Sequence, residues 1–258
     1  MQYLDLTLPT LAANLALDEA LLETAEEQHS DLEFLRLWES PQTMVVVGRS
    51  SRVQDEVNEA ACRQERVPIF RRSSGGAAIV AGPGCLMYAI VLSYERRPAL
   101  RDISRAHAFV LGRLSTSLAP LLNHVGTVSM AGTSDLVIVQ GAGSREQGGR
   151  CVRSIRKFSG NSMRVKRTHL LYHGTLLYDF DLPLMERYLL APPRQPGYRN
   201  ARSHREFVMN VPASRRQLAD AVRAAWSGTT ELDEVPMSRV NELVATRFRS
   251  ERWNYEFP

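Results

Sequence analysis

The sequence predicts an α+β fold in which helices flank a mixed, largely antiparallel sheet. Several strand-like segments follow one another with only short turns between them, which is unlike the regular alternation of strand and helix in a doubly wound sheet. The segments with helical spacing are set apart from this run. Of the 258 residues, 44% are hydrophobic and 23% are charged, so the chain has enough apolar material for a large core.

In the N-terminal half, one helix precedes a run of strands. Apolar residues from Leu11 to Ala25 recur at helical spacing, which indicates an amphipathic helix that packs on the core. A second, short helix is predicted over residues 55–64. Strands are predicted over residues 35–38, 44–47, 67–70, 77–81 and 86–92. The turns at residues 73–76 and 82–84 each contain two glycines, which predicts sharp reversals of the chain.

The C-terminal half continues with longer elements and one loop. Strands are predicted over residues 135–139 and 170–178, and helices over residues 101–122, 214–226 and 238–248. Residues 141–150 are rich in glycine and polar side chains, which predicts a mobile loop.

Charge and cysteine content restrict the class of protein. No apolar run reaches the roughly 18–20 residues that cross a bilayer, and we expect a soluble cytoplasmic protein that binds neither a membrane nor nucleic acid. Residues 145–167 contain eight basic residues and one acid, Glu146, which indicates an anionic partner or a solvated surface. Cys62, Cys85 and Cys151 are odd in number and widely spaced, which favours neither a disulfide framework nor a Cys-x-x-Cys metal site, so reduced thiols are expected.

Three short clusters carry residues suited to chemistry: residues 71–76, residues 157–161 and residues 173–175. Paired glycines let backbone N–H groups approach an anion, and a neighbouring arginine adds a fixed positive fork. A lysine such as Lys157 could stabilise charge that develops during acyl transfer. Each cluster alone has a plainer interpretation, because Gly75-Gly76 also suits a hairpin turn and Lys157 a solvated surface beside a Ser-Gly-Asn turn.

In their order and spacing, these clusters resemble the motifs of the lipoate–protein ligase and octanoyltransferase superfamily, most nearly its lipoate–protein ligase A type. Ser134-Asp135-Leu136 lies between the first two clusters, and the resemblance covers about residues 10–212. It implies the catalytic fold of biotin and lipoate ligases, which is similar to class II aminoacyl-tRNA synthetases. It also implies a single catalytic domain over residues 1–258, with a short helical extension over 213–258 in place of a full accessory domain.

The resemblance further implies roles for individual residues. Lys157 is expected to be catalytic and to contact the activated acyl carboxyl group or its phosphate. Acyl-binding residues are expected to be Arg72, Ser74, Gly75, Gly76, Ala77, Gly160, His173, Gly174 and Thr175. Nucleotide-binding residues are expected to be Arg71, Asp135, Ser159 and Asn161. Asp135 would also bind the Mg²⁺ that accompanies ATP, and no other metal site is expected.

The implied activity is that of a lipoate–protein ligase. Such an enzyme uses ATP to convert lipoate or octanoate to an acyl-adenylate, and then transfers the acyl group to a lysine of an acceptor domain. The expected acceptors are lipoyl domains such as the E2 subunit of 2-oxoacid dehydrogenases, the glycine cleavage H protein or a similar carrier. Because residues 215–258 are too few for the usual accessory domain, a separate accessory subunit is a further candidate partner.

Two alternatives remain open. An ATP-independent octanoyl or lipoyl transferase would carry the acyl group as a cysteine thioester, and Cys151 is the candidate, since Arg150 and Arg153 would favour its thiolate. A non-catalytic protein that binds lipoyl domains is the other alternative. The retention of Lys157 together with the paired glycines and His173 argues against it.

Overall fold

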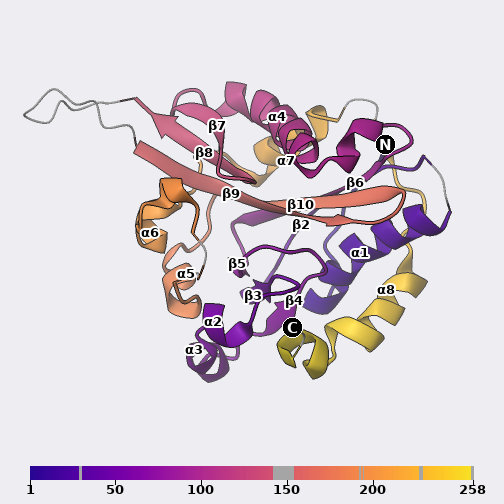
Figure 1. Ribbon diagram of the computed structural model, residues 1–258, viewed down its shortest axis with the longest axis horizontal. Coiled ribbons are helices and arrows are strands. Elements are labelled where there is room, and N and C mark those ends of the chain that lie inside the picture. Colours follow the sequence, from indigo (N-terminus) through magenta and orange to yellow (C-terminus); the bar gives the residue numbers. More distant parts are fainter. Residues whose placement is uncertain (29–30, 142–153, 192, 194, 227–228, 257–258) are drawn as a thin grey trace, which may run out of the picture.

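The computed structural model describes most of the chain, namely residues 1–28, 31–141, 154–191, 193, 195–226 and 229–256. These residues form an eight-stranded sheet, in the order β11-β1-β2-β6-β10-β9-β8-β7, and a three-stranded sheet, in the order β4-β3-β5 (Figure 1). In the large sheet, β1 is parallel to both of its neighbours, whereas the successive pairs from β2 to β7 are antiparallel. The predicted mixed, largely antiparallel sheet is therefore confirmed.

The elements have the following bounds. The large sheet contains β1 (Gln2–Asp5), β2 (Phe34–Glu39), β6 (Cys85–Ser93), β7 (Thr127–Ala131), β8 (Asp135–Gln140), β9 (Ser154–Val165), β10 (His169–Leu177) and β11 (Thr230–Glu231). The small sheet contains β3 (Met44–Val47), β4 (Ile69–Arg71) and β5 (Ile79–Ala81). The α-helices are α1 (Leu11–Glu27), α2 (Val53–Glu56), α3 (Glu59–Gln64), α4 (Ile103–Leu122), α5 (Pro183–Tyr188), α6 (His204–Phe207), α7 (Arg215–Ala224) and α8 (Met237–Leu243). Shorter helical turns are η1 (Pro98–Arg101), η2 (Gly197–Arg199), η3 (Val244–Phe248) and η4 (Arg252–Glu256).

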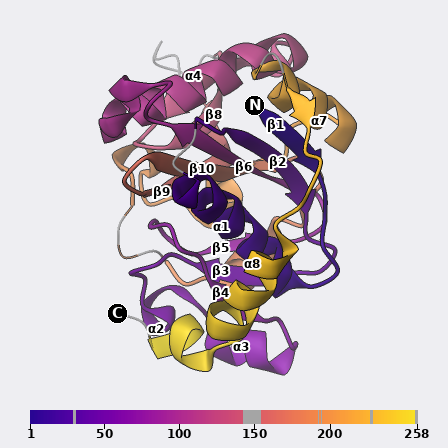
Figure 2. The same ribbon diagram turned by 90° about the vertical axis from the view of Figure 1, so that its right-hand side faces the viewer.

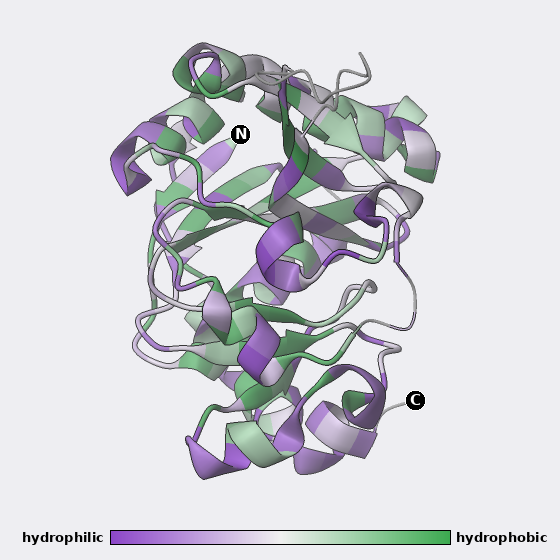
Figure 3. Ribbon diagram, turned by 90° about the vertical axis from the view of Figure 1, so that its left-hand side faces the viewer, coloured by the Kyte–Doolittle hydropathy of each residue, from purple (hydrophilic) through white to green (hydrophobic). Residues whose placement is uncertain are grey.

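Two hydrophobic cores cover the two faces of the large sheet. One lies under α4 and α7, and the other lies between the sheet, α1 and the small sheet (Figure 2). Hydrophobic residues are accordingly frequent in the central strands, while polar residues are frequent on the outer helices (Figure 3). Helix α8 packs against α1 on its outer side. Eleven of the 17 residues of α1 are buried, so this helix is covered on more sides than its amphipathic pattern predicts.

Most of the predicted elements are confirmed, and four strands were missed: β1, β7, β9 and β11. The interpretation of Lys157 as lying beside a turn is wrong, because residues 157–161 lie within the long strand β9. Basic residues and a glycine hide the strand pattern there. The hairpin interpretation of Gly75-Gly76 is also wrong, because β4 and β5 each pair with β3 and not with each other. The predicted helix over residues 55–64 is divided into α2 and α3 by the extended backbone of Val57.

Two further findings concern the class of protein. Among the described residues, no helix combines the length and the apolar character that crossing a membrane requires. Within the predicted loop at residues 141–150, only Gly141 belongs to the described residues, and Cys151 also lies outside them.

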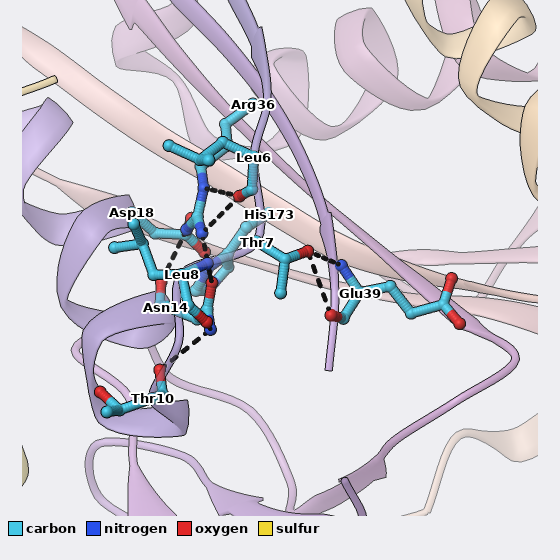
Figure 4. A network of polar contacts seen from close by, with 9 residues as sticks. All are labelled: Leu6, Thr7, Leu8, Thr10, Asn14, Asp18, Arg36, Glu39 and His173. Carbon is cyan, nitrogen blue, oxygen red and sulfur yellow. Dashed lines mark hydrogen bonds and ion pairs between the residues drawn. The ribbon is translucent and has the colours of Figure 1, made fainter. Parts of the chain in front are cut away.

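A buried arginine ties α1 to the large sheet (Figure 4). Arg36 of β2 has no exposed surface, and its Nη1 donates to Oδ1 of Asp18 and to the carbonyl of Asn14, each at 2.6 Å. Its Nη2 donates to Oδ1 of Asn14 at 2.7 Å and to the carbonyl of Leu6 at 3.0 Å, and its Nε donates to the same Leu6 carbonyl. All five guanidinium N–H groups therefore have acceptors, which a buried arginine requires.

Replacing Arg36 with leucine should lower the free energy of unfolding by about 3–5 kcal/mol, because Asp18 would remain buried without its cation. The double variant Arg36→Leu/Asp18→Leu should be less destabilised than the single variant. Urea denaturation measures both. Removing the exposed pair of Arg216 and Asp220 by Arg216→Ala is the control and should have little effect. A loss below about 1 kcal/mol for Arg36→Leu would show that the pair is not a stabilising constraint.

Candidate active site

A groove with two lobes lies between the large sheet and the small sheet. The first lobe has a volume of about 420 Å³, and it is lined by α1, β3, the segment after β4, and β6, β8, β9 and β10. The second lobe, of about 140 Å³, extends toward α5 and α6. Both lobes are lined by Ala77, Asp135, Lys157, Gly160 and Thr175, so these residues mark the junction between them.

Most of the residues predicted for the site meet in this groove. The first lobe is lined by Arg72, Gly76, Ala77, Asp135, Lys157, Gly160, Asn161, His173, Gly174 and Thr175. Ser159 is fully buried and borders the second lobe. Ser74 and Gly75 lie behind the wall of the first lobe, where they contact residues that line it.

Lys157 and Asp135 form an ion pair at the junction of the lobes. Nζ of Lys157 lies 2.8 Å from Oδ1 of Asp135, and Oδ2 of the same carboxylate accepts a hydrogen bond from the hydroxyl of Tyr198 at 2.6 Å. Burial and the charge of Asp135 raise the pKa of Tyr198, so this hydroxyl remains a donor at neutral pH. The carboxylate is thus held from both sides, and the ammonium group of Lys157 has a fixed anchor.

An irregularity in β9 directs Lys157 into the groove. Val137 pairs with Lys157 but the preceding Leu136 pairs with Ser159, so Phe158 is the extra residue of a β-bulge. Because of the bulge, Lys157 and Gly160 share one face, whereas in a regular strand residues three apart face opposite sides. A Cβ at Gly160 would lie 2.8 Å from Nζ of Lys157. Gly160 therefore leaves room for the lysine side chain.

The segment after β4 forms one wall of the first lobe. Arg72 is buried, and its guanidinium donates to the carbonyls of Val46, Gly75 and Ala77. Gly76 has a φ of +88°, in the region that favours glycine. Burial lowers the pKa of Arg72 to about 10, a shift that the nearby Glu56 opposes, so the guanidinium remains charged at neutral pH. Arg72 thus shapes the wall through backbone carbonyls.

His173 connects this wall to α1. Its Nε2 lies 2.5 Å from Oγ of Ser74, and its Nδ1 lies 3.7 Å from Oδ2 of Asp18, the carboxylate that Arg36 holds (Figure 4). Oγ of Ser74 also accepts a hydrogen bond from Nε of Arg72 at 3.1 Å. A continuous polar chain therefore runs from Arg36 to Arg72 along the first lobe.

Asn161 and Ser159 use their side chains within the protein. Nδ2 of Asn161 donates to the carbonyl of Ser134 at 2.7 Å, and its Oδ1 accepts hydrogen bonds from the hydroxyls of Tyr88 and Ser159. These contacts join β6, β9 and the turn before β8. In this structure both side chains hold the walls of the groove together.

The structure does not bring Arg71, predicted to bind nucleotide, to the groove with the others. Its side chain is fully buried, and it donates to the carbonyls of Gly48, Arg49 and Ser51 and of two residues in η4. Arg71 stands beside Arg72 in the sequence, but alternation along the strand end sends the two side chains in different directions. Arg71 therefore lines neither lobe, although its neighbour Arg72 lines the first.

Sequence reasoning missed several residues of the groove. The second lobe adds Glu56, Arg199 and His204, and Tyr198 of η2 lies beside the groove, where it donates to Asp135. Burial lowers the pKa of His204, which favours its neutral form. No local motif marks Glu56, Tyr198 or Arg199, since they come to the groove only through the packing of α2 and η2. His204 belongs to Arg202-Ser203-His204, which extends the family resemblance, but no role was predicted for it.

The two described cysteines do not line either lobe. Cys62 and Cys85 are 1% and 0% exposed. Burial raises the pKa of the Cys62 thiol to about 11 and raises that of Cys85 further above its ordinary value. Both are therefore thiols of the core, which agrees with the expectation of reduced cysteines, and neither is placed as a nucleophile.

Comparison with known proteins defines the family. A family model described as the lipoyl protein ligase A/B catalytic domain matches residues 10–224. The chain therefore belongs to the lipoyl protein ligase A/B catalytic domain family. A probable lipoate-protein ligase A from Mycoplasma pneumoniae is 26% identical over 253 residues, which cover 94% of this chain and 67% of that protein.

Solved structures show the same fold. A bipartite lipoate protein ligase from Thermoplasma acidophilum, described with its E2 lipoyl domain, matches with a TM-score of 0.78 and 22% identity, covering 98% of this chain and 95% of that chain. A lipoate-protein ligase A bound with ATP matches with a TM-score of 0.77 and 21% identity, covering 98% and 97% of the two chains. The α+β fold of this chain is thus that of lipoate–protein ligases.

Changing Tyr198 to phenylalanine should lower the turnover of acyl transfer about tenfold, which corresponds to about 1.4 kcal/mol, because Asp135 would lose one of its two partners and hold Lys157 less firmly. Steady-state assays with acceptor domain measure the effect. Tyr178→Phe is the matched control, since Tyr178 also donates to a carboxylate, Glu39, but Glu39, unlike Asp135, lines neither lobe. Equal losses in the two variants would contradict a special role for Tyr198.

Proposed function

We propose that this chain is an ATP-dependent lipoate–protein ligase, which activates lipoate or octanoate as an acyl-adenylate and passes the acyl group to a lysine of an acceptor domain. The observation that carries the proposal is the position of Lys157, a cation that is paired with Asp135 and lines both of two adjacent lobes at their junction. Two substrates that react with each other must meet at such a junction. The names of the relatives, and the ATP bound to one structural neighbour, support the same activity.

In the first step, the carboxylate of lipoate attacks the α-phosphorus of ATP and pyrophosphate leaves. We assign the acyl chain to the first lobe, where Leu15, Val46, Ile79 and Met87 supply apolar lining. The nucleotide would occupy the second lobe. Lys157 then lies where the carboxylate meets the phosphate, and its ammonium group would stabilise the negative charge of the transition state.

In the second step, the lysine amine of the acceptor attacks the acyl carbonyl and AMP leaves, which forms the amide bond. The same ammonium group of Lys157 would stabilise the charge on the carbonyl oxygen and on the departing phosphate. The backbone carbonyl of Lys157 accepts a hydrogen bond from the N–H of Met209 at 2.8 Å, so the main chain at the lysine is also fixed. A fixed donor needs little reorganisation during the reaction.

Mg²⁺ would enter the groove with ATP. Within the described residues, no group of three or more His, Cys, Asp or Glu side chains could hold a metal ion by itself. Mg²⁺ in nucleotide sites commonly uses one or two carboxylates together with substrate phosphates, and Asp135 is the carboxylate at the junction. We also place the reaction in the cytoplasm, where ATP and acceptor proteins are present.

For the acceptor, we propose a lipoyl domain, such as that of an E2 subunit, or the H protein. The Thermoplasma ligase that shares this fold is described with its E2 lipoyl domain, which supports the proposal. We further propose that residues 1–258 act as one catalytic domain, since α8 and η3 pack on α1 and η4 packs on β4. A separate accessory subunit is a candidate partner, and assays should be run with and without one.

The test is the mass gain of an apo acceptor domain incubated with the protein, lipoate, ATP and Mg²⁺. The expected product carries one lipoyl group, and Lys157→Ala should reduce its rate of formation by at least about a hundredfold, a typical loss for a removed transition-state donor. Lys166, the other of the two lysines in the sequence, provides the control variant Lys166→Ala, which should remain active. Product from octanoyl-acyl carrier protein without ATP, and none with lipoate and ATP, would contradict the ligase.

A second test concerns the cysteine of the transferase alternative. Cys151→Ser should leave the ligase reaction within about twofold of the original rate, because adenylate chemistry needs no thioester. Mass spectrometry of the protein after reaction should also find no acyl group on Cys151. Loss of activity in Cys151→Ser, together with an acylated thiol in the unmodified protein, would favour the transferase.

A further inference from the structure

We propose that the C-terminal turn η4 positions the wall of the acyl lobe. Trp253 and Asn254 form hydrogen bonds with Arg71, and Arg71 forms hydrogen bonds with the main chain of residues 48–51. These residues in turn contact the main chain at Gly76. We call Trp253 and Asn254 the C-terminal clamp. The inference rests on the proposed function only for its kinetic test.

The first step is the contact between the clamp and the main chain of Arg71. Strand β4 is at the edge of the small sheet, with β3 on its inner side. On its outer side, the N–H of Arg71 donates to Oδ1 of Asn254 at 3.0 Å, and Nε1 of Trp253 donates to the carbonyl of Arg71 at 2.9 Å. Nδ2 of Asn254 donates to the carbonyl of Phe248 at 3.0 Å, which fixes the orientation of the amide. The clamp therefore takes the place of a neighbouring strand.

The second step is the side chain of Arg71. Its Nε donates to the carbonyl of Trp253 at 2.8 Å and its Nη2 to that of Asn254 at 3.2 Å. Its Nη1 donates to the carbonyls of Gly48, at 2.8 Å, and Ser51, at 2.7 Å. A fully buried guanidinium needs these acceptors, since an unpaired buried charge is costly. One side chain thus joins the clamp to residues 48–51.

The third step leads from residues 48–51 to the groove. The N–H of Arg49 donates to the carbonyl of Ser74 at 2.8 Å, and Oγ of Ser51 donates to the carbonyl of Gly76 at 3.1 Å. A Cβ at Gly48 would lie 1.8 Å from that same carbonyl oxygen, so the two backbones are in close contact. Gly76 lines the first lobe. A displacement of Arg71 must therefore reach the wall of the acyl lobe.

The contacts that lead from the C-terminal clamp to Gly76 do not include Lys157 or Asp135. Lys157 and Asp135 lie on β9 and β8 of the large sheet, whereas the clamp acts on the small sheet. Loosening the clamp should consequently weaken ground-state binding of the acyl substrate and leave turnover nearly unchanged. A purely structural role would instead lower the melting temperature without separating KM from kcat.

The test uses Trp253→Phe, which removes one hydrogen bond and keeps an aromatic ring, and Arg71→Lys, which removes the fork. Both variants should raise the KM for lipoate, by about tenfold in Arg71→Lys, with kcat within about twofold. Arg97→Lys is the matched control, because Arg97 makes a paired contact with Glu33 away from the groove. It should lower the melting temperature and leave the KM unchanged.

A second readout needs no catalysis. Amide hydrogen exchange of the free protein should become faster at Arg49, whose N–H donates to Ser74, in Trp253→Phe but not in Arg97→Lys. An unchanged KM and unchanged exchange at Arg49 in a folded Trp253→Phe would overturn the clamp. If the unmodified protein fails to lipoylate an acceptor, the proposed function fails, and the exchange measurement then decides the clamp by itself.

Discussion

The ion pair between Arg36 and Asp18 is the constraint on which the groove depends. A guanidinium without exposed surface must find an acceptor for every N–H group, and α1 supplies three of the five contacts through Asn14 and Asp18. These contacts hold α1 in place on the large sheet. The position of the helix then sets the distance between Leu15 on α1 and His173 on β10, and with it the width of the first lobe.

At the junction of the two lobes, the charged groups are arranged around one carboxylate. Asp135 binds the ammonium group of Lys157 on one oxygen and the hydroxyl of Tyr198 on the other. Asp135 therefore holds the ammonium group of Lys157 in place before an anionic substrate binds. To contact that substrate, the ammonium group must give up part of its contact with Asp135. A partly buried site strengthens such interactions relative to water. The groove thus combines a wall held by buried hydrogen bonds with a charge pair that an anion can exchange.

Most of the residues that the sequence motifs single out meet in the groove, but the strand that carries Lys157 was not predicted. Short motifs can be recognised from the sequence without knowledge of tertiary contacts, and such motifs contain Lys157, Gly76 and His173. Strand β9 was missed because its basic residues and Gly160 interrupt the alternation that marks a half-buried strand. Tyr198 could not be found either, since its role is a contact with a residue 63 positions away. Such partners are fixed by packing, which no local pattern encodes.

The β-bulge at Phe158 has a consequence for anyone who moves this site to another scaffold. Side chains along a regular strand alternate between the two faces of the sheet, and the bulge shifts this alternation by one residue between Lys157 and Gly160. If residues 157–160 were placed on a regular strand of another protein, Lys157 and Gly160 would lie on opposite faces. The lysine side chain would then no longer pass over the glycine. The direction of the Lys157 side chain therefore depends on the register shift between β8 and β9 as well as on the identity of the residue.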